Sequence, residues 1–155
     1  MDVTLREITD GNCEAVLALS VAPAQERFVG SVRDALELAV EIPEAKPWYR
    51  AIYAADRPVG FVMVSWDVEP QSDDDIFGPW FLWKLIVDER YQRGGVGREA
   101  VRQVAALVRA AGAAELLTSY MPGDGDPGGF YQRLGFVPTG EFDSEGEPLL
   151  RLPLG

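Results

Sequence analysis

The chain of 155 residues has a net charge of −11, one cysteine and no histidine. Its length suits one domain with a hydrophobic core, so we expect residues 1–155 to form a single domain. The lack of histidine excludes Ser-His-Asp hydrolysis, Cys-His hydrolysis and His-ligated metals, and we expect no metal site. The strong acidity argues against nucleic acid as a partner, because phosphate binding needs a concentrated basic face.

Other features predict a cytoplasmic protein with no membrane partner. No apolar run reaches the roughly 18 residues that a transmembrane helix requires. The N-terminus, MDVTLREITD, lacks the basic start and apolar stretch of a secretory signal. The single thiol of Cys13 cannot form an intramolecular disulfide, which agrees with a reducing compartment.

The first half of the chain predicts a strand, two helices and a β-hairpin, in that order. Ser31 begins the second helix, with Asp34 three residues later as in a capping box. The turn Asp56-Arg57-Pro58 separates the two strands of the hairpin. The expected ranges are 3–8 for the strand, 12–20 for the first helix, 31 to the proline at 43 for the second, and 48–54 and 59–66 for the hairpin.

The second half predicts a strand–helix–strand unit, a short helix and a terminal hairpin. The helix over 95–110 is the clearest element, because its apolar residues, Leu107 among them, recur on one face and Gly112 ends it. Asp126 resembles an N-cap for the short helix. The expected ranges are 69–79 for a loop, 80–87 and 114–120 for the strands of the unit, 126–134 for the short helix, and 136–142 and 148–154 for the hairpin.

This element order, β α α β β β α β α β β, predicts an α/β fold (α+β mixed sheet) built on one sheet. The three strands before the long helix are expected to be antiparallel. The strand–helix–strand unit at 80–120 is expected to be parallel and right-handed. The last strand, LLRLPL, would allow a homodimer through strand or sheet contacts.

The segment 88–98, DERYQRGGVGR, carries the strongest functional signal. A buried strand leads into a glycine-bearing turn that opens a helix. The first turn of a helix offers free N–H groups and the positive end of the helix dipole, and both bind phosphates. Arg90, Arg93 and Arg98 gather at this end although bases are disfavoured there, which indicates a bound anion. A plain turn with scattered surface arginines is the alternative.

Two other phosphate-binding motifs agree less well with the sequence. No G-x-x-x-x-G-K-[ST] is present, which rejects a P-loop. Residues 95–100 match G-x-G-x-x-[GA], but a dinucleotide-binding fold needs further parallel βα units and an acid at the end of the next strand. Glu115 lies at the start of that strand, so Rossmann-type nucleotide binding is a minor alternative.

Two motifs in the chain resemble those of the GNAT family of N-acetyltransferases. Residues 92–97, QRGGVG, match the signature Q/R-x-x-G-x-G/A, and they follow a strand that reads LWKLIVD. Residues 130–136, FYQRLGF, resemble the family's l-Y-x-x-L-G-F segment. The spacing of the motifs and the element order agree over most of the chain. The N-terminal half, with VAPAQERFV and PVGFVMV, is similar to bacterial diamine or spermine/spermidine acetyltransferases, a less specific match.

This resemblance implies a GNAT-like fold, acetyl-CoA as cosubstrate, and direct acetyl transfer to a primary amine of a small cationic molecule such as a polyamine. It implies that backbone groups of Leu85, Ile86 and Val87 hold the pantetheine arm, and that Tyr131 protonates the departing thiolate. The residues implied to hold the pyrophosphate are Gln92, Arg93, Gly94, Gly95, Val96, Gly97 and Arg98. Asp124 stands where the family often has asparagine, so the contacts of the loop 122–129 are open.

Several roles are left open by the sequence. The candidate general bases are Glu26, Glu41, Asp73, Asp74 and Asp75, each of which also fits a solvated surface carboxylate. The candidates for an aromatic acceptor pocket are Trp48, Trp66, Trp80 and Trp83, although such residues are usually core. Phe130 and Leu134 should face the core, and Tyr131, rotated about 100° from Phe130, need not be buried. A non-catalytic acyl-CoA-binding module is the alternative function, because the glycine turn argues for binding rather than turnover.

Overall fold

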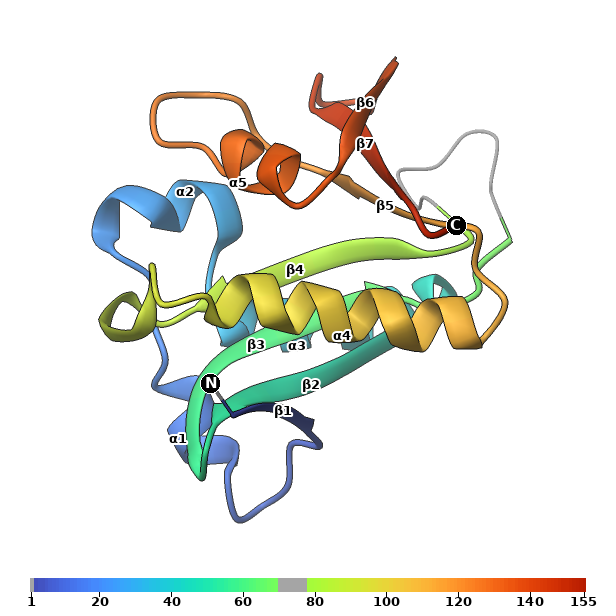
Figure 1. Cartoon of the computed structure of the whole chain (residues 1–155). Coiled ribbons are helices and arrows are strands. Elements are labelled where there is room, and N and C mark those ends of the chain that lie inside the picture. The colour runs from blue at the N-terminus through green and yellow to red at the C-terminus, as the bar shows by residue number, and fades with distance from the viewer. Residues whose placement is uncertain (1, 70–77) are drawn as a thin grey trace.

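The computed structural model describes residues 2–69 and 78–155, and the strands in this part form one mixed sheet (Figure 1). Strand order across the sheet is β1-β2-β3-β4-β5-β7-β6. The first four strands are antiparallel, β4 and β5 are parallel, and β7 pairs antiparallel with β5 and with β6. The predicted mixed sheet, its antiparallel first strands and its parallel strand–helix–strand unit are therefore confirmed.

The bounds of most elements agree with the sequence prediction. The strands are β1 (Val3–Arg6), β2 (Pro47–Ala54), β3 (Arg57–Ser65), β4 (Phe81–Val87), β5 (Glu115–Ser119), β6 (Val137–Phe142) and β7 (Pro148–Pro153). The α-helices are α1 (Cys13–Leu17), α2 (Glu26–Val29), α3 (Val32–Glu41), α4 (Val96–Ala110) and α5 (Gly128–Arg133). Short 3-10 turns are η1 (Pro23–Gln25), η2 (Pro43–Ala45) and η3 (Glu89–Tyr91).

The predicted helix over 12–20 is wrong in length, and the helical turns over 23–29 were not predicted. The helix α1 ends early because the backbone N–H of Ser20 donates to Asp88 Oδ2 at 3.0 Å instead of continuing the helix. Pro23 then opens the turn η1, which leads into α2. The capping box of α3 is confirmed, since Asp34 N donates to Ser31 Oγ at 3.1 Å and Ser31 N donates to Asp34 Oδ2 at 3.2 Å.

Helices cover both faces of the sheet and bury two apolar clusters (Figure 1). Because successive residues of a strand face opposite sides, Val62 and Val64 of β3 pack with the α4 cluster, while Phe61 and Met63 pack with α1 and α3. The helix α4 buries a narrow stripe, made of Val96, Ala100, Val101, Val104 and Val108. The expectation that Leu107 shares this stripe is wrong, because Leu107 lies beside the buried i+4 row and is 44% exposed.

The strands β4 and β5 separate shortly after they meet. Their described pairing covers only two positions, Phe81 with Leu117 and Leu82 with Thr118, and Thr118 Oγ1 donates to Leu82 O at 2.9 Å. By contrast, β4 stays paired with β3 as far as Val87, with a register shift around Trp83. Beyond Leu82, the side of β4 that would face β5 is therefore left open. Within residues 2–69 and 78–155, no helix is long and apolar enough to span a bilayer.

Candidate active site

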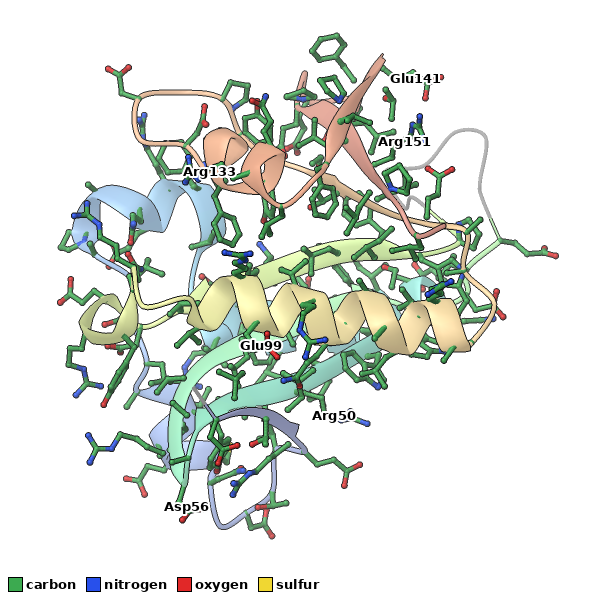
Figure 2. The ribbon with its side chains drawn as sticks, viewed as in Figure 1. Arg50, Asp56, Glu99, Arg133, Glu141 and Arg151 are labelled. Carbon is green, nitrogen blue, oxygen red and sulfur yellow. The ribbon has the colours of Figure 1, made fainter. Side chains whose placement is uncertain are left out.

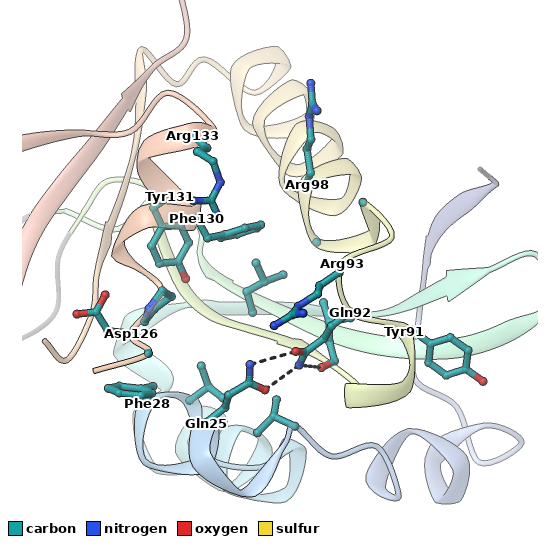
Figure 3. A pocket seen from close by; sticks show the side chains of 18 residues that line it. Gln25, Phe28, Tyr91, Gln92, Arg93, Arg98, Asp126, Phe130, Tyr131 and Arg133 are labelled. Atoms are coloured by element: carbon teal, nitrogen blue, oxygen red, sulfur yellow. Dashed lines mark hydrogen bonds between the residues drawn. The ribbon is translucent and has the colours of Figure 1, made fainter. Parts of the chain in front are cut away.

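A first cavity of about 360 Å³ opens where β4 leaves β5 (Figure 3). Its walls come from β4, the turn before α4, the helix α5 and the segment around η1 and α2. Of the residues predicted to form the site, those lining this cavity are Leu85, Val87, Gln92, Arg93, Gly95, Gly97, Arg98 and Tyr131. The side chain of Ile86 is buried on the other face of the sheet. Val96, the first residue of α4, is buried in the apolar cluster between α4 and the sheet, and Gly94 does not line the cavity.

The turn before α4 presents backbone N–H groups toward this cavity. Arg93 and Gly95 both have positive φ, at 66° and 88°, and Gly95 is the N-cap of α4. No side chain caps this helix start, and Glu99 N is the first amide that bonds back, to Gly95 O at 3.0 Å. The amides of the first turn are thus available to an anionic ligand, which the positive end of the helix dipole also favours.

Positive charge lines the first cavity in a protein that is acidic overall. Arg93 and Arg98 lie on the α4 side, and Arg133 comes from α5 on the opposite wall (Figures 2 and 3). No carboxylate in the described part of the chain forms an ion pair with these three side chains. Arg90, which the sequence grouped with them, instead pairs with Asp88 at 2.8 Å and does not line the cavity. Sequence reasoning missed Arg133, although it lies within the second motif.

A buried carboxylate fixes the start of this turn. Asp88 accepts from Ser20 N at 3.0 Å, from Arg90 N at 3.0 Å and from Arg90 Nε at 2.8 Å. Burial alone would raise the pKa of Asp88, but the hydrogen bonds from Arg90 and Ser20 hold it below its ordinary value of 3.8. Asp88 therefore joins the phosphate-side turn to the segment after α1.

Gln92 makes a second link to the N-terminal segment. Its side chain donates to Gln25 Oε1 at 2.9 Å and to Val87 O at 2.8 Å, and it accepts from Gln25 Nε2 at 3.0 Å (Figure 3). Both N–H groups of the Gln92 side-chain amide already donate to protein acceptors. A contact between Gln92 and a pyrophosphate would therefore have to come from its backbone, and it stays a prediction. The carbonyl of Val87 is likewise already bound.

The two sequence motifs meet at Gly97. A Cβ atom at Gly97 would lie 3.2 Å from Cζ of Phe130 and 3.5 Å from Cγ2 of Val87. A glycine here lets α5 approach the start of α4, so the cavity has walls on both sides. The loop before α5 is held by Asp126, which accepts from Gly123 N and Gly128 N, both at 2.9 Å.

The helix α2 makes contacts with the loop 122–129, whose contacts the sequence left open. Arg27 Nη2 donates to the backbone carbonyl of Asp124 at 3.0 Å, and a Cβ at Gly123 would lie 3.2 Å from the same Arg27 nitrogen. Asp124 itself is not among the cavity residues. Gly125, Asp126 and Pro127 of this loop do line the first cavity. The loop thus forms part of the cavity rim and is tied to α2.

Tyr131 lies in the wall between the first cavity and a second one, and it is more deeply buried than the sequence suggested. Its side chain is 6% exposed and packs edge-on against Phe130 and Phe136, with ring centroids 5.5 Å and 5.4 Å apart. Burial raises the pKa of Tyr131 to about 12, and a side-chain hydrogen bond with Thr118 offsets part of the rise. Tyr131 is therefore protonated at neutral pH, and its role as an acid stays a prediction.

The second cavity, of about 310 Å³, lies on the other side of Tyr131. Its apolar walls include Phe28, Trp83 and Tyr120, and its polar groups are Lys84, Ser119, Asp143, Glu145 and Glu147. Only Trp83 of the four candidate tryptophans lines it, because Trp66 packs against Trp48 at 5.3 Å and Trp80 at 5.0 Å.

None of the candidate bases from the sequence lines either cavity in the described residues. Glu26 and Glu41 lie elsewhere, and Asp73, Asp74 and Asp75 fall outside the described residues. Two carboxylates face the second cavity from partly buried positions, Asp143 and Glu147, and sequence reasoning missed both. Burial and the nearby charges of Asp143 and Glu145 raise the pKa of Glu147.

An uncapped helix start and three arginines beside an open strand are features that suit an extended, phosphate-bearing ligand. A buried, protonated tyrosine lies at the inner end of the cavity, and this arrangement suits an acyltransferase that uses a coenzyme A thioester. The sequence model of the acetyltransferase (GNAT) domain matches residues 47–138, and the chain belongs to this family. It is an N-acetyltransferase, and acetyl-CoA is its cosubstrate.

Individual relatives agree with this family. Spermine/spermidine N(1)-acetyltransferase of Bacillus subtilis (strain 168) is 30% identical over 152 residues, which cover 97% of each chain. An acetyltransferase from Thermus thermophilus has a TM-score of 0.69 at 22% identity and covers 99% of this chain and 97% of its own. PaiA N-acetyltransferase from Thermoplasma acidophilum, solved with coenzyme A, has a TM-score of 0.67 at 12% identity over 99% of both chains. The two solved structures show that the fold is shared.

Proposed function

We propose that the protein acetylates a primary amine of a small cationic acceptor, with a polyamine as the first choice. The observation that carries this proposal is the position of Tyr131 between a cavity bordered by arginines and a cavity bordered by carboxylates. The polyamine acceptor named for the Bacillus subtilis relative supports this choice. The net charge of −11 also favours cationic substrates over anionic ones.

In this proposal the first cavity receives acetyl-CoA. The first-turn amides of α4, together with Arg93, Arg98 and Arg133, would hold the pyrophosphate. The pantetheine arm would run along the open side of β4 near Leu85, where β5 no longer pairs with β4 in the described residues. The acetyl thioester would then lie close to Tyr131.

The proposed chemistry is direct transfer. The lone pair of the amine forms the N–C bond, the C–S bond breaks, and the sulfur takes the Tyr131 proton. A pKa of about 12 lies about 3.5 pKa units above that of an ordinary thiol, so proton transfer from Tyr131 to a thiolate that has already been released would cost about 5 kcal/mol. We therefore propose that proton transfer accompanies C–S cleavage, and that the positively charged nitrogen returns a proton to Tyr131.

A thiol-release assay with acetyl-CoA and an amine panel tests this function. The panel would hold diamines, spermidine, spermine, amino acids and aminoglycosides. We expect release with polyamines, and about a 100-fold lower kcat for Tyr131→Phe with a KM for acetyl-CoA within about threefold of wild type. Tyr91→Phe is the matched control, because Tyr91 also lines the first cavity but its hydroxyl accepts from Arg57.

Two outcomes would count against the proposal. Unchanged turnover in Tyr131→Phe would reject the acid role of Tyr131. Binding of coenzyme A without thiol release on any amine of the panel would instead indicate a non-catalytic acyl-CoA-binding module.

A further inference from the structure

We infer that Glu147 accepts the proton that the acceptor ammonium must lose before it attacks the thioester. This inference rests on the proposed amine acetylation and adds a catalytic residue to it. It starts from the position of the Glu147 carboxylate in the second cavity, which shares Tyr131 and Leu85 with the first cavity.

Two neighbouring residues of β5 relate Glu147 to Tyr131. Thr118 is the neighbour that lowers the pKa of Tyr131 against the effect of burial, and the hydroxyl of Ser119 donates to Glu147 Oε1 at 3.4 Å. Because consecutive strand residues face opposite sides of a sheet, these contacts lie on the two faces of β5. The opening between β4 and β5 joins these faces, since the strands pair at only two described positions. An amine held by Glu147 would therefore reach a thioester beside Tyr131 through this opening.

The hairpin holds Glu147 in a defined position. Its backbone N–H donates to Asp143 Oδ1 at 2.8 Å, and its carbonyl accepts from Asp143 N at 3.0 Å. Ser119 restrains the side chain from β5. The carboxylate is thus fixed from two elements while it still lines the cavity, which is the arrangement that proton transfer at a set distance requires.

The other carboxylates of this cavity are less suited to the role. Asp143 Oδ1 already accepts from Glu145 N at 2.9 Å and from Glu147 N at 2.8 Å, so this oxygen is committed to the turn. Glu145 is exposed, whereas Glu147 is partly buried. Burial, followed by the charges of Asp143 and Glu145, raises the pKa of Glu147, which makes it a stronger base than an ordinary glutamate.

Lys84 of β4 faces the same cavity from the opposite wall. Its Nζ donates to Val29 O at 3.4 Å, and its pKa is lowered by burial despite the opposing charges of Asp34 and Glu147. Because the charge of Glu147 raises the pKa of Lys84, the same attraction opposes the upward pKa shift that Asp143 and Glu145 cause at Glu147. The titration of Glu147 depends on all of these groups.

Two side chains, Glu147 and Tyr131, account for every proton that moves in the proposed reaction. The ammonium gives one proton to the Glu147 carboxylate and becomes a free amine. The amine forms the N–C bond while the C–S bond breaks, the sulfur takes the Tyr131 proton, and the new amide nitrogen returns its extra proton to Tyr131. Glu147 is partly exposed, so it can pass its proton to solvent before the next turnover. The net products are the acetamide, coenzyme A and one proton.

The variant Glu147→Gln tests this role, with Glu141→Gln, an exposed glutamate of β6 in the same hairpin, as the matched control. We expect about a 100-fold lower kcat for Glu147→Gln at pH 7, with acetyl-CoA affinity unchanged because the first cavity is intact. The deficit should shrink toward pH 10, where the free amine is already abundant, and the acidic limb of the kcat/KM profile assigned to Glu147 should disappear. Glu141→Gln should keep the wild-type rate and profile, because Glu141 does not line the second cavity. Thermal unfolding would verify that both variants fold.

The two proposals fail in different ways. A wild-type enzyme that acetylates amines while Glu147→Gln keeps its rate and its pH profile would overturn the inference alone. An equal loss in Glu141→Gln would also overturn it, because that result reflects the charge of the hairpin rather than one base. A wild-type enzyme with no thiol release on any amine would reject the proposed function and this inference together.

Discussion

A single methyl group added at Gly97, next to Phe130, should change coenzyme A binding and the free energy of unfolding by very different amounts. In Gly97→Ala the new Cβ would lie 3.2 Å from Cζ of Phe130, a few tenths of an ångström closer than ordinary contact. Displacing this ring edge should cost about 1 kcal/mol. Alanine in place of glycine inside a helix returns up to about 1 kcal/mol. We therefore expect the free energy of unfolding to change by less than about 1 kcal/mol and Tm to shift by a few degrees at most.

Acetyl-CoA binding should respond far more strongly to Gly97→Ala. Gly97 lines the first cavity at the first turn of α4, and in the proposed binding mode the added methyl group would hinder a phosphate oxygen that approaches the amides of this turn. The loss of one hydrogen bond to a charged group costs about 1.5–3 kcal/mol, which corresponds to a Kd about 10- to 150-fold weaker. Isothermal titration with coenzyme A, beside thermal unfolding of the free protein, measures both quantities.

Gly94→Ala is the control for this experiment. Its Cβ would meet nothing closer than Tyr91 O at 3.9 Å, its φ is not positive, and Gly94 does not line the cavity. We expect wild-type affinity and stability for this variant. The reasoning would be refuted by wild-type affinity in Gly97→Ala, or by an equal loss of affinity in Gly94→Ala, since the second result would show that any added side chain in the turn disturbs binding.

Two further predictions concern charged groups around the same turn. Asp88→Asn should lower the free energy of unfolding by about 2–3 kcal/mol at pH 7, because Ser20 N and Arg90 lose a charged acceptor. The pKa of Asp88 is lower in the folded protein than its ordinary value of 3.8, so this stabilisation is fully present above pH 3.8. It is lost as the pH falls through the lowered pKa of the folded state. Urea unfolding at pH 2 should therefore show little difference in the free energy of unfolding between variant and wild type. Arg133→Ala should raise the KM for acetyl-CoA about 10- to 100-fold and weaken the salt dependence of that KM. Arg109→Ala is the control and should change neither quantity, because Arg109 lies at the other end of α4, far from the first cavity. Equal KM values for the two variants would contradict the role of Arg133.

The sequence predicts best the elements whose causes are local. The helix α4 follows from its apolar period, and the capping box at Ser31 needs only Asp34, three residues away. The segment after α1 could not be predicted in the same way, because its course depends on bonds to Asp88 and Gln92, which are 68 and 67 residues distant from Ser20 and Gln25. Such contacts carry no local signal.

The same distinction separates the two cavities. The glycine turn and the arginines beside it are contiguous in sequence, so the sequence predicts that they lie together. Arg90 is the exception, because it pairs with Asp88 and does not line the cavity. Glu147 stands in a hairpin that resembles any solvated acidic turn. Its carboxylate accepts a hydrogen bond from Ser119 of β5, 28 residues away in the sequence, and nothing in the sequence indicates that contact.

The early separation of β4 from β5 gives a strand in the middle of the sheet some properties of an outer strand. Unpaired main-chain groups of this kind usually recruit another polypeptide and promote aggregation. Here the open stretch lies at the bottom of a cavity, between the start of α4 and the short helix α5, where a second chain cannot lie flat against it. A slender ligand arm can enter the same space. The shape of the opening therefore selects for narrow molecules and protects the protein from self-association through this strand.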